Sequence, residues 1–326
     1  MVSETQFKPA WWLGNSHLQT LWPTICRRNI KNLTLRRERL NLPDGDFIDL
    51  DWVEQAEPSP IVLILHGLEG SIESHYAKGM LKAFAQLGWR GVFMHFRGCS
   101  GEPNRLPRSY HSGETGDVNY VARLLAEREP ETPLAAIGFS LGGNVLLKWL
   151  GETGAHNPLV AAVAISVPFE LYKAVTRIQH GFSRVYQWYL IKSLRCRLSQ
   201  KFQVSPTLFD PGLLYKVSTI YDFDTKITVP LHGFTNIEEY YSMASSRGYL
   251  RDIQVPTLIL HAKDDPFMSE DIIPQPSELS PKVTLEITEK GGHVGFVGGK
   301  YPWQAEYWLE KRVPNFLEGY FGGWDF

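Results

Sequence analysis

Short, largely apolar runs recur along the chain and are separated by segments of helical character. The runs span 61–65, 90–96, 134–139, 159–166, 256–261 and 283–288. Runs of this length and composition are typical of strands that are buried on both faces of a parallel sheet. Helices are expected between them, for example at 77–87 and 116–128. The pattern therefore predicts an α/β fold with a mostly parallel central sheet and helices on both of its faces.

The chain before the first of these runs predicts a hairpin at 35–52. A Pro-Asp-Gly sequence at 43–45 supplies its turn. After the turn, Asp49 and Asp51 alternate with apolar residues, namely Ile48, Leu50 and Trp52. Such alternation is typical of a strand with one buried and one solvated face. We therefore expect a half-buried strand here.

The alternation of strands and helices is interrupted between 169 and 254. Within this stretch, apolar residues recur at the spacing of an amphipathic helix: Ile178, Phe182, Val185, Trp188, Ile191, Leu194 and Leu198. Gly181 can split this helix in two. We interpret 169–254 as a helical cap inserted into a single domain that spans 1–326, and we expect a last helix at 303–321.

One stretch combines a strand, a tight turn and a helix, and its turn has the sequence Gly138-Phe-Ser140-Leu-Gly142. The two glycines leave room where side chains would collide, so Ser140 is held at the tip of a sharp bend. A hydroxyl there lies at a helix N-terminus, which favours a developing negative charge. The pattern predicts a nucleophilic serine, and a tight turn without a catalytic role is the alternative.

A serine becomes a nucleophile at neutral pH only with a base and an orienting carboxylate beside it. After a turn of this kind, the acid and then the histidine follow the serine along the chain. Asp264 and Asp265 follow one later apolar run, and His293, with glycines around it, follows the next. We assign His293 as the base. We assign Asp265 as the acid, because it begins the turn with a proline after it, and Asp264 is the alternative.

The first apolar run ends in the sequence His-Gly-Leu-Glu-Gly at 66–70. Backbone amides at the carboxyl edge of an open α/β sheet lie where ligands bind. The N–H groups of Leu68 and Leu141 are therefore predicted to form an oxyanion hole. The flanking residues are assigned to substrate binding: His66, Gly67 and Phe139. Since this histidine precedes the serine in the chain, we interpret it as a structural residue and not as the base.

Two further features could carry chemistry. Cys99, in a long irregular loop, could be a nucleophile, but no helix follows it. The aromatic segment Trp11–Pro23 either packs over the domain or forms a wall of the active-site cleft, with His17 near it. The sequence has no cluster with metal-ligand spacing and no glycine-rich phosphate loop. We therefore expect neither a metal nor a cofactor.

Composition and charge narrow the classes of function. The chain has 326 residues, of which 43% are hydrophobic and 21% charged, and a formal net charge of −2. Nothing in this balance attracts nucleic acid. Three separate cysteines favour a reducing compartment over a disulfide framework. The N-terminal residues lack the apolar core of a signal peptide, and no run is long enough to span a membrane. We expect a cytoplasmic protein.

The motifs together resemble the YheT-like branch of the α/β-hydrolases: Asn15–Thr20, His66–Gly70, Arg97–Gly101, Gly138–Asn144, Asp264–Pro266 and Gly291–Phe296. That branch includes yeast medium-chain acyl ester synthase/esterases and mammalian phospholipid-cleaving relatives. The resemblance implies an α/β-hydrolase fold and an esterase with Ser140, Asp265 and His293 as its triad. His95 departs from the family pattern, which often has Asp or Asn at that position, so the hydrogen bonding of the loop after it stays open.

The sequence thus predicts a serine carboxylesterase that acts on short- to medium-chain acyl esters, lipid esters among them, through an acyl-enzyme. Its partner would be a small acyl ester. Two alternatives stay open. One is acyl transfer to an alcohol at the same site, and the other is a protein of this fold that only binds a ligand or partner.

A basic stretch in the expected cap bears on partners. Between Leu171 and Phe209 the chain has no acidic residue but several basic ones: Lys173, Arg177, Arg184, Lys192, Arg195, Arg197 and Lys201. One interpretation is a solvated basic face balanced by acids elsewhere in the fold. The other is a cap that rests on an anionic membrane surface and admits acyl chains from it.

Overall fold

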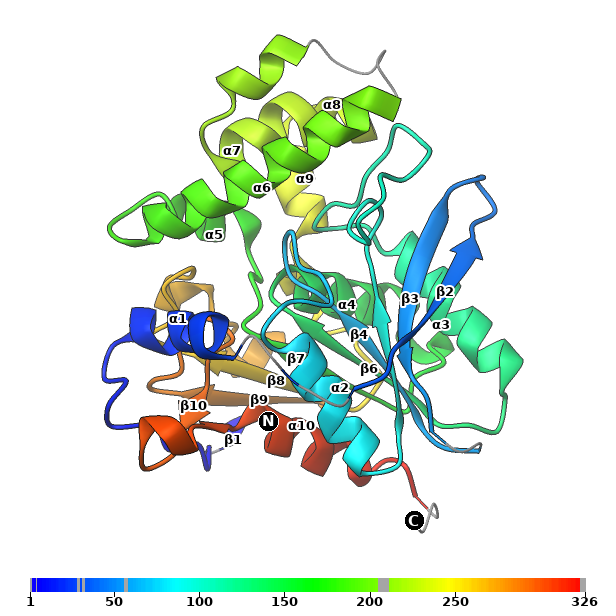
Figure 1. Ribbon diagram of the computed structural model, residues 1–326, viewed down its shortest axis with the longest axis vertical. Coiled ribbons are helices and arrows are strands. Elements are labelled where there is room, and N and C mark those ends of the chain that lie inside the picture. The colour runs from blue at the N-terminus through cyan, green and yellow to red at the C-terminus, as the bar shows by residue number, and fades with distance from the viewer. Residues whose placement is uncertain are drawn as a thin grey trace.

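The computed structural model describes residues 2–3, 5–27, 30, 33–55, 58–204 and 211–322. Within them, nine strands form one sheet in the order β1-β9-β8-β7-β6-β4-β5-β3-β2, and β10 and β11 form a small second sheet (Figure 1). The strands are β1 Val2–Ser3, β2 Arg36–Asn41, β3 Phe47–Val53, β4 Ile61–Leu65, β5 Arg90–Met94, β6 Leu134–Phe139, β7 Ala161–Ile165, β8 Thr257–Ala262, β9 Val283–Thr288, β10 Val297–Gly298 and β11 Glu306–Tyr307.

The order of pairing confirms the predicted α/β fold. Strands β4 to β9 pair in parallel, while β2 and β3 add an antiparallel edge next to β5. The helices are α1 Ser16–Cys26, α2 Ala77–Gln86, α3 Gly116–Arg128, α4 Leu141–Thr153, α5 Leu171–Arg177, α6 Ser183–Val204, α7 Ile220–Phe223, α8 Val229–His232, α9 Ile237–Ala244 and α10 Leu309–Glu318.

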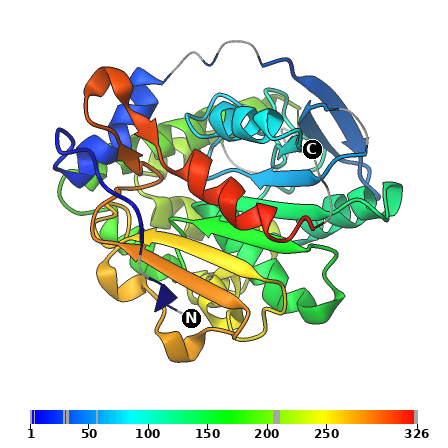
Figure 2. The same cartoon turned by 90° about the horizontal axis from the view of Figure 1, so that it is seen from below.

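Helices cover both faces of the sheet because its central strands are apolar on both sides. In β4, Leu63 packs in the same hydrophobic cluster as α3 and α4. Its neighbours Val62 and Ile64 point the other way, into a cluster with α2 and α10. Figure 2 shows α10 crossing beneath the strands. Burial on both faces explains why these strands have continuous apolar sequences.

The segment between β7 and β8 is helical and lies over the carboxyl edge of the sheet, at the top of Figure 1. Gly181, with φ near 60°, separates α5 from α6, as the sequence predicts. The segment has small apolar clusters of its own, one around Tyr240 and one around Leu194. Residues 205–210 lie outside the described ranges. The segment is thus helical, as expected, and its role as a cap with the boundaries 169–254 remains our proposal.

Two expectations about individual elements are wrong. Strand β3 is buried on both faces, because Asp49 and Asp51 stand opposite Arg39 and Arg37 of β2 and pair with them at 2.8 and 2.7 Å. The last helix begins at Leu309, after a 3₁₀ turn and the short strand β11. None of the described helices is both long and apolar enough to cross a bilayer.

Candidate active site

Ser140 lies in the turn between β6 and α4, with a φ of 52°. A Cβ on Gly138 would lie 2.5 Å from the carbonyl oxygen of Gly142, and one on Gly142 would lie 2.5 Å from the carbonyl oxygen of His66. Neither position therefore accepts a side chain, and the turn can be this tight only with glycine at both. The Ser140 amide donates to the Ile165 carbonyl at 2.8 Å, which ties the turn to β7.

The loop after β9 brings His293 to this serine. Its Nε2 lies 3.0 Å from Ser140 Oγ, and its Nδ1 lies 2.8 Å from Asp265 Oδ2. An ionised carboxylate only accepts hydrogen bonds, so Nδ1–H donates to it and Nε2 is left to accept the serine proton. The ring of Phe267 stacks on the imidazole at 4.0 Å, nearly parallel to it. The three residues that the sequence assigns to a triad are thus joined in one hydrogen-bonded chain.

Asp264 holds the histidine loop from its backbone. Its Oδ1 accepts from the amides of Gly291 and Gly292, both at 2.9 Å. Burial raises the pKa of its carboxyl, and these amide bonds oppose that shift. Of the two aspartates, it is therefore Asp265 that faces the imidazole of His293.

Two hydroxyl groups to which the sequence analysis assigns no role complete the support of this loop. Thr20 Oγ1 of α1 accepts from the His293 amide at 2.9 Å, and Ser166 Oγ accepts from the Val294 amide at 3.0 Å. Both Ser166 and Val294 have positive φ values, of 52° and 56°. Strained backbone at two non-glycine residues that are hydrogen-bonded to each other is typical of functional sites. No sequence pattern predicts this strain.

The predicted oxyanion amides lie beside the serine. In the loop after β4, the amides of Gly67 and Glu69 donate to the hydroxyls of Tyr76 and Tyr110. No described residue accepts from the amide of Leu68 between them. Leu141 is the first residue of α4, so its amide has no partner within the helix. Both leucines line the cavity that contains Ser140.

Of the three residues assigned to substrate binding, one lines the cavity and two do not. Gly67 lines the cavity. His66 and Phe139 are fully buried and do not line it, which corrects that assignment for their side chains. His66 Nε2 accepts from the Phe96 amide, and burial lowers its pKa to about 3. Phe139 stacks on Tyr76 at 4.1 Å. His66 is thus the structural residue that its place in the chain suggests.

The cavity has a volume of about 750 Å³ and is walled by the loop after β4, by α1 and by the cap. From α1, Thr20, Leu21 and Thr24 line it. The aromatic N-terminal segment therefore contributes a wall of the cleft. His17 does not line it, and its Nδ1 lies 3.1 Å from the Tyr186 hydroxyl of α6.

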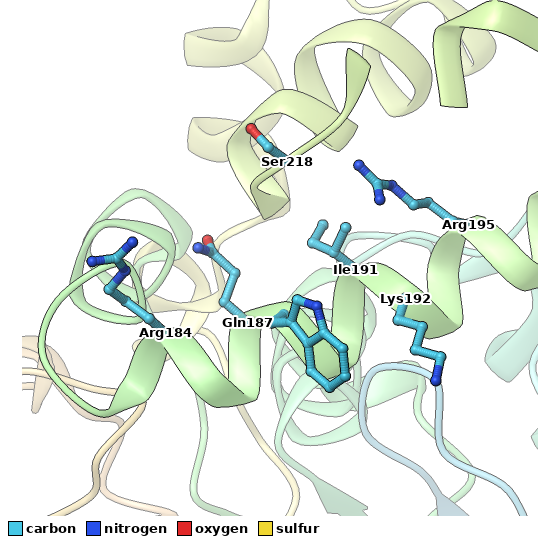
Figure 3. A pocket seen from close by; sticks show the side chains of 7 residues that line it. Arg184, Gln187, Ile191, Lys192, Arg195 and Ser218 are labelled. Carbon is cyan, nitrogen blue, oxygen red and sulfur yellow. The ribbon is translucent and has the colours of Figure 1, made fainter. Parts of the chain in front are cut away.

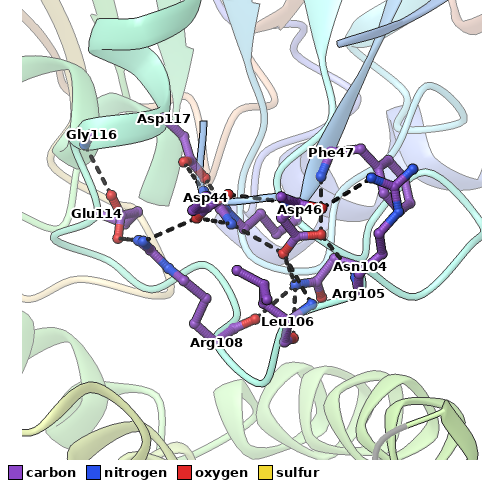
Figure 4. A network of polar contacts seen from close by, with 12 residues as sticks. Asp44, Asp46, Phe47, Asn104, Arg105, Leu106, Arg108, Glu114, Gly116 and Asp117 are labelled. Carbon is purple, nitrogen blue, oxygen red and sulfur yellow. Dashed lines mark hydrogen bonds and ion pairs between the residues drawn. The ribbon is translucent and has the colours of Figure 1, made fainter. Parts of the chain in front are cut away.

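The long loop after β5 is fixed by a buried polar network, shown in Figure 4. Arg97 pairs with Asp117 at 2.6 Å and with Asp46 at 3.0 Å, and Asn104 donates to Asp46 at 2.6 Å. His95 stands where related hydrolases often have Asp or Asn, and its Nε2 lies 2.7 Å from Asp51 Oδ2. This contact answers the question of the hydrogen bonding at that position.

Cys99, the rival nucleophile, lies in the same loop. Burial raises the pKa of its thiol to about 12, and a thiol with so high a pKa is a poor nucleophile at neutral pH. Among the described residues, no three His, Cys, Asp or Glu side chains gather in a way that could hold a metal ion.

Comparison with known proteins agrees with this architecture. Residues 60–300 match the family model described as the alpha/beta hydrolase fold. YheT of Escherichia coli (strain K12), a candidate esterase by name, is 46% identical over 98% of this chain and 94% of its own. Phospholipase ABHD3 of Mus musculus is 30% identical over 98% of this chain and 79% of its own. The chain therefore belongs to the α/β-hydrolase family, and within it to the YheT-like branch.

Among solved structures, an esterase from Pyrococcus furiosus superposes with a TM-score of 0.57 over 90% of this chain and 98% of its own. At 17% identity this likeness shows the fold alone. With the family established, the chain is an esterase- or lipase-like hydrolase.

Proposed function

We propose that this protein is a serine carboxylesterase that uses Ser140, His293 and Asp265 as its catalytic triad. One observation carries the proposal: the hydrogen-bonded chain from Ser140 Oγ through His293 to Asp265 opens into a single large cavity. Nucleophile, base and orienting acid are the minimum set for acyl transfer through a covalent intermediate.

The mechanism follows from the contacts. His293 Nε2 takes the hydroxyl proton as Ser140 Oγ attacks the ester carbonyl, and the Asp265 carboxylate stabilises the imidazolium through Nδ1–H. The amides of Leu68 and Leu141 bind the oxyanion. The imidazolium then protonates the leaving alcohol, which gives an acyl-enzyme. Water, deprotonated by the same Nε2, releases the acid and restores the serine.

We propose acyl esters of short to medium chain length, lipid esters among them, as the substrate class. The cap wall of the cavity supports this proposal because it is mainly apolar, with Leu171, Val175 and Ile178 among its residues. The mouse relative's name, a phospholipase, points in the same direction. A series of p-nitrophenyl esters of increasing acyl length, assayed for kcat/KM, tests the chain-length range.

The triad is tested by substitution. Ser140→Ala and His293→Ala should each lower esterase turnover by about four to six orders of magnitude, and the double variant should be little worse than either. Ser242→Ala, at an exposed serine of α9, is the matched control and should keep full activity. A fluorophosphonate probe should label the wild type at Ser140. Near-normal turnover in Ser140→Ala, or labelling elsewhere, contradicts the mechanism. Product analysis with added ethanol separates hydrolysis from acyl transfer.

A cytoplasmic location is also part of the proposal. Cys26, Cys99 and Cys196 are all free thiols, which suits a reducing compartment. Fractionation of cells that express the protein, followed by immunoblotting, is the measurement that checks it.

Fewer basic residues of the cap are available to contact an anionic membrane than the sequence indicates. Arg197 and Lys201 turn inward, to Glu69 and to the carbonyl of Asn104, and Lys173 pairs with Glu170 at 2.9 Å. Two of the seven basic residues of the stretch are thus paired with acids elsewhere in the fold, and Lys201 is held by oxygens of the loop after β5.

The proposal now rests on exposed residues near the cavity. Arg184 and Lys192 are exposed residues of α6 that line a second pocket (Figure 3). Trp188 and Tyr189, which line the cavity, are 63% and 64% exposed. We expect co-sedimentation with anionic vesicles that salt weakens. Arg184→Gln/Lys192→Gln should reduce it, while the control Lys300→Gln/Lys311→Gln should not. Equal partition to anionic and zwitterionic vesicles, or none to either, contradicts the proposal.

A further inference from the structure

Asp224 is an acid in a mostly apolar part of the cavity wall. It lies between α7 and α8 of the cap and lines the same cavity as Ser140. Only 9% of the residue is exposed. Its cap neighbours on this wall are mostly apolar, with Leu171, Ala174, Val175, Ile178 and Ile220 among them. Aspartate is seldom buried in such surroundings without a partner that requires it there.

The carboxyl has hydroxyl partners but no cation. Thr228 Oγ1 donates to its Oδ1 at 2.8 Å, and the Tyr241 hydroxyl donates to its Oδ2 at 3.0 Å. The other two acids of the cavity wall are paired: Glu69 with Arg197 and Glu73 with Lys78. Among the described residues, Asp224 is thus the one acid of the wall for which no ion pair is formed.

The backbone at this position is also unusual. Asp224 begins a π-helical turn, Asp224–Thr228, between two single turns of α-helix. Turns of this type are rare and occur frequently at functional sites. Here the wide turn lies where a carboxyl reaches the cavity from the cap.

Each carboxylate oxygen has more than one lone pair, so the two hydroxyl donors leave acceptor capacity unused. Desolvation raises the pKa of this carboxyl to about 7, so both of its forms are accessible near neutral pH. A hydroxyl group suits both: it donates to the ionised form and accepts from the protonated one. Because the wall around it is apolar, a neutral hydroxyl is also cheaper to bury there than a charged group.

We propose that Asp224 is a specificity residue that hydrogen-bonds a hydroxyl group of the ester substrate, remote from the scissile carbonyl. The inference rests on the proposed esterase function and names its substrate class: esters that carry a free hydroxyl in the acyl or the alcohol part. A plain alkyl ester leaves the carboxyl without this partner, and sites built for a hydroxyl discriminate strongly against analogues that lack it.

The experiment uses butyl decanoate and two analogues, one with an ω-hydroxyl on the acyl chain and one with an ω-hydroxyl on the butyl group. In the wild type, one hydroxylated ester should exceed butyl decanoate in kcat/KM by about tenfold or more, through a lower KM. The analogue that shows the preference locates the hydroxyl. Asp224→Leu should abolish the preference, so that kcat/KM for the hydroxylated ester falls to about that for butyl decanoate measured with the same variant.

Two further variants separate recognition from support of the cap. Asp224→Asn keeps an acceptor and should retain most of the preference. Asp222→Asn, the matched control, changes an acid of α7 that does not line the cavity, and should retain all of it. If Asp224→Leu does not fold, Asp224→Ala replaces it. The measured quantity is the ratio of kcat/KM for the hydroxylated ester to kcat/KM for butyl decanoate. If this ratio is the same in the wild type and in the apolar variant, the proposal is wrong.

Binding without turnover keeps this inference separate from the proposed function. Titration calorimetry on Ser140→Ala compares butyl decanoate with each of its two hydroxylated analogues. Tighter binding of a hydroxylated ester, lost in Ser140→Ala/Asp224→Leu, supports the subsite even if the wild type hydrolyses no ester, and that failure would then fall on the proposed function alone. Equal affinity for butyl decanoate and both hydroxylated analogues overturns the subsite.

Discussion

Two adjacent aspartates after β8 support the same histidine loop in different ways. Asp265 accepts from the imidazole of His293, and Asp264 accepts from the backbone amides of Gly291 and Gly292. One carboxylate therefore orients the ring, and the other fixes the loop that carries it. Both side chains are carboxylates, and their roles differ only because they point towards different groups.

Asparagine substitutions should distinguish these roles. Asp265→Asn offers an N–H to His293 Nδ1 in place of an acceptor, which favours the wrong tautomer, so we expect kcat to fall by about 10⁴. Asp264→Asn keeps an oxygen for the two amides, and we expect kcat within about tenfold of the wild type. Steady-state kinetics on a p-nitrophenyl ester measures both. If Asp264→Asn is the crippling change, the assignment of the acid is wrong, although the serine mechanism stands.

At this scale, the sequence predicts the residues whose position a short motif defines. The glycines around Ser140 and His293, and the acidic turn at Asp265, can be found by inspection. Thr20 and Ser166 support the same loop but lie 273 and 128 residues from their partners. A single hydroxyl that accepts from a distant amide has no local sequence signature, so folding alone brings it to the site.

Helix α6 connects the cap to the predicted oxyanion hole. Arg197 donates to Glu69 at 2.8 Å, and the same Glu69 oxygen accepts from the Tyr110 hydroxyl. Glu69 follows Leu68 directly and has a φ of 54°. A cap residue thus helps to hold the strained loop whose amide would bind the oxyanion.

This ion pair is mostly buried, so losing one partner should be worse than losing both. Arg197→Met leaves the Glu69 carboxylate uncompensated and should reduce the free energy of unfolding by about 3 kcal/mol. Arg197→Met/Glu69→Gln removes both charges and should recover part of that loss. Urea unfolding and kcat complete the double-mutant cycle, with Arg184→Met on the exposed side of α6 as the control. Additive effects of the two substitutions would contradict the coupling.

Periodicity predicts elements well where burial alone decides them. The central strands and the division at Gly181 follow from runs and spacings. Strand β3 does not, because its burial depends on Arg37 and Arg39 standing opposite Asp49 and Asp51, and register is not visible in either strand alone. The start of α10 is missed because the residues before Leu309 have no distinct pattern.

Across the whole molecule, burial keeps several histidines neutral. Desolvation lowers the pKa of five of them, to about 3 for His66, His75 and His111 and to about 4 for His232 and His261. In the unfolded chain each would titrate near 6.5. Their contribution to stability is therefore full above pH 6.5 and is lost as the pH falls towards the folded pKa, because the unfolded state binds the protons.

The protein should accordingly lose stability on mild acidification. Each histidine should contribute a loss of about 1 kcal/mol between about pH 7.5 and about pH 5.5, partly offset by Asp224, whose raised pKa acts in the opposite direction. His261 tests this best, because it is buried in β8 and no described residue bonds its Nδ1. In urea unfolding at both pH values, His261→Leu should lose about 1 kcal/mol less than the wild type over this interval. His156→Leu, the same change at an exposed position, is the matched control. A His261→Leu protein that loses as much stability as the wild type would show that its burial does not set the acid sensitivity.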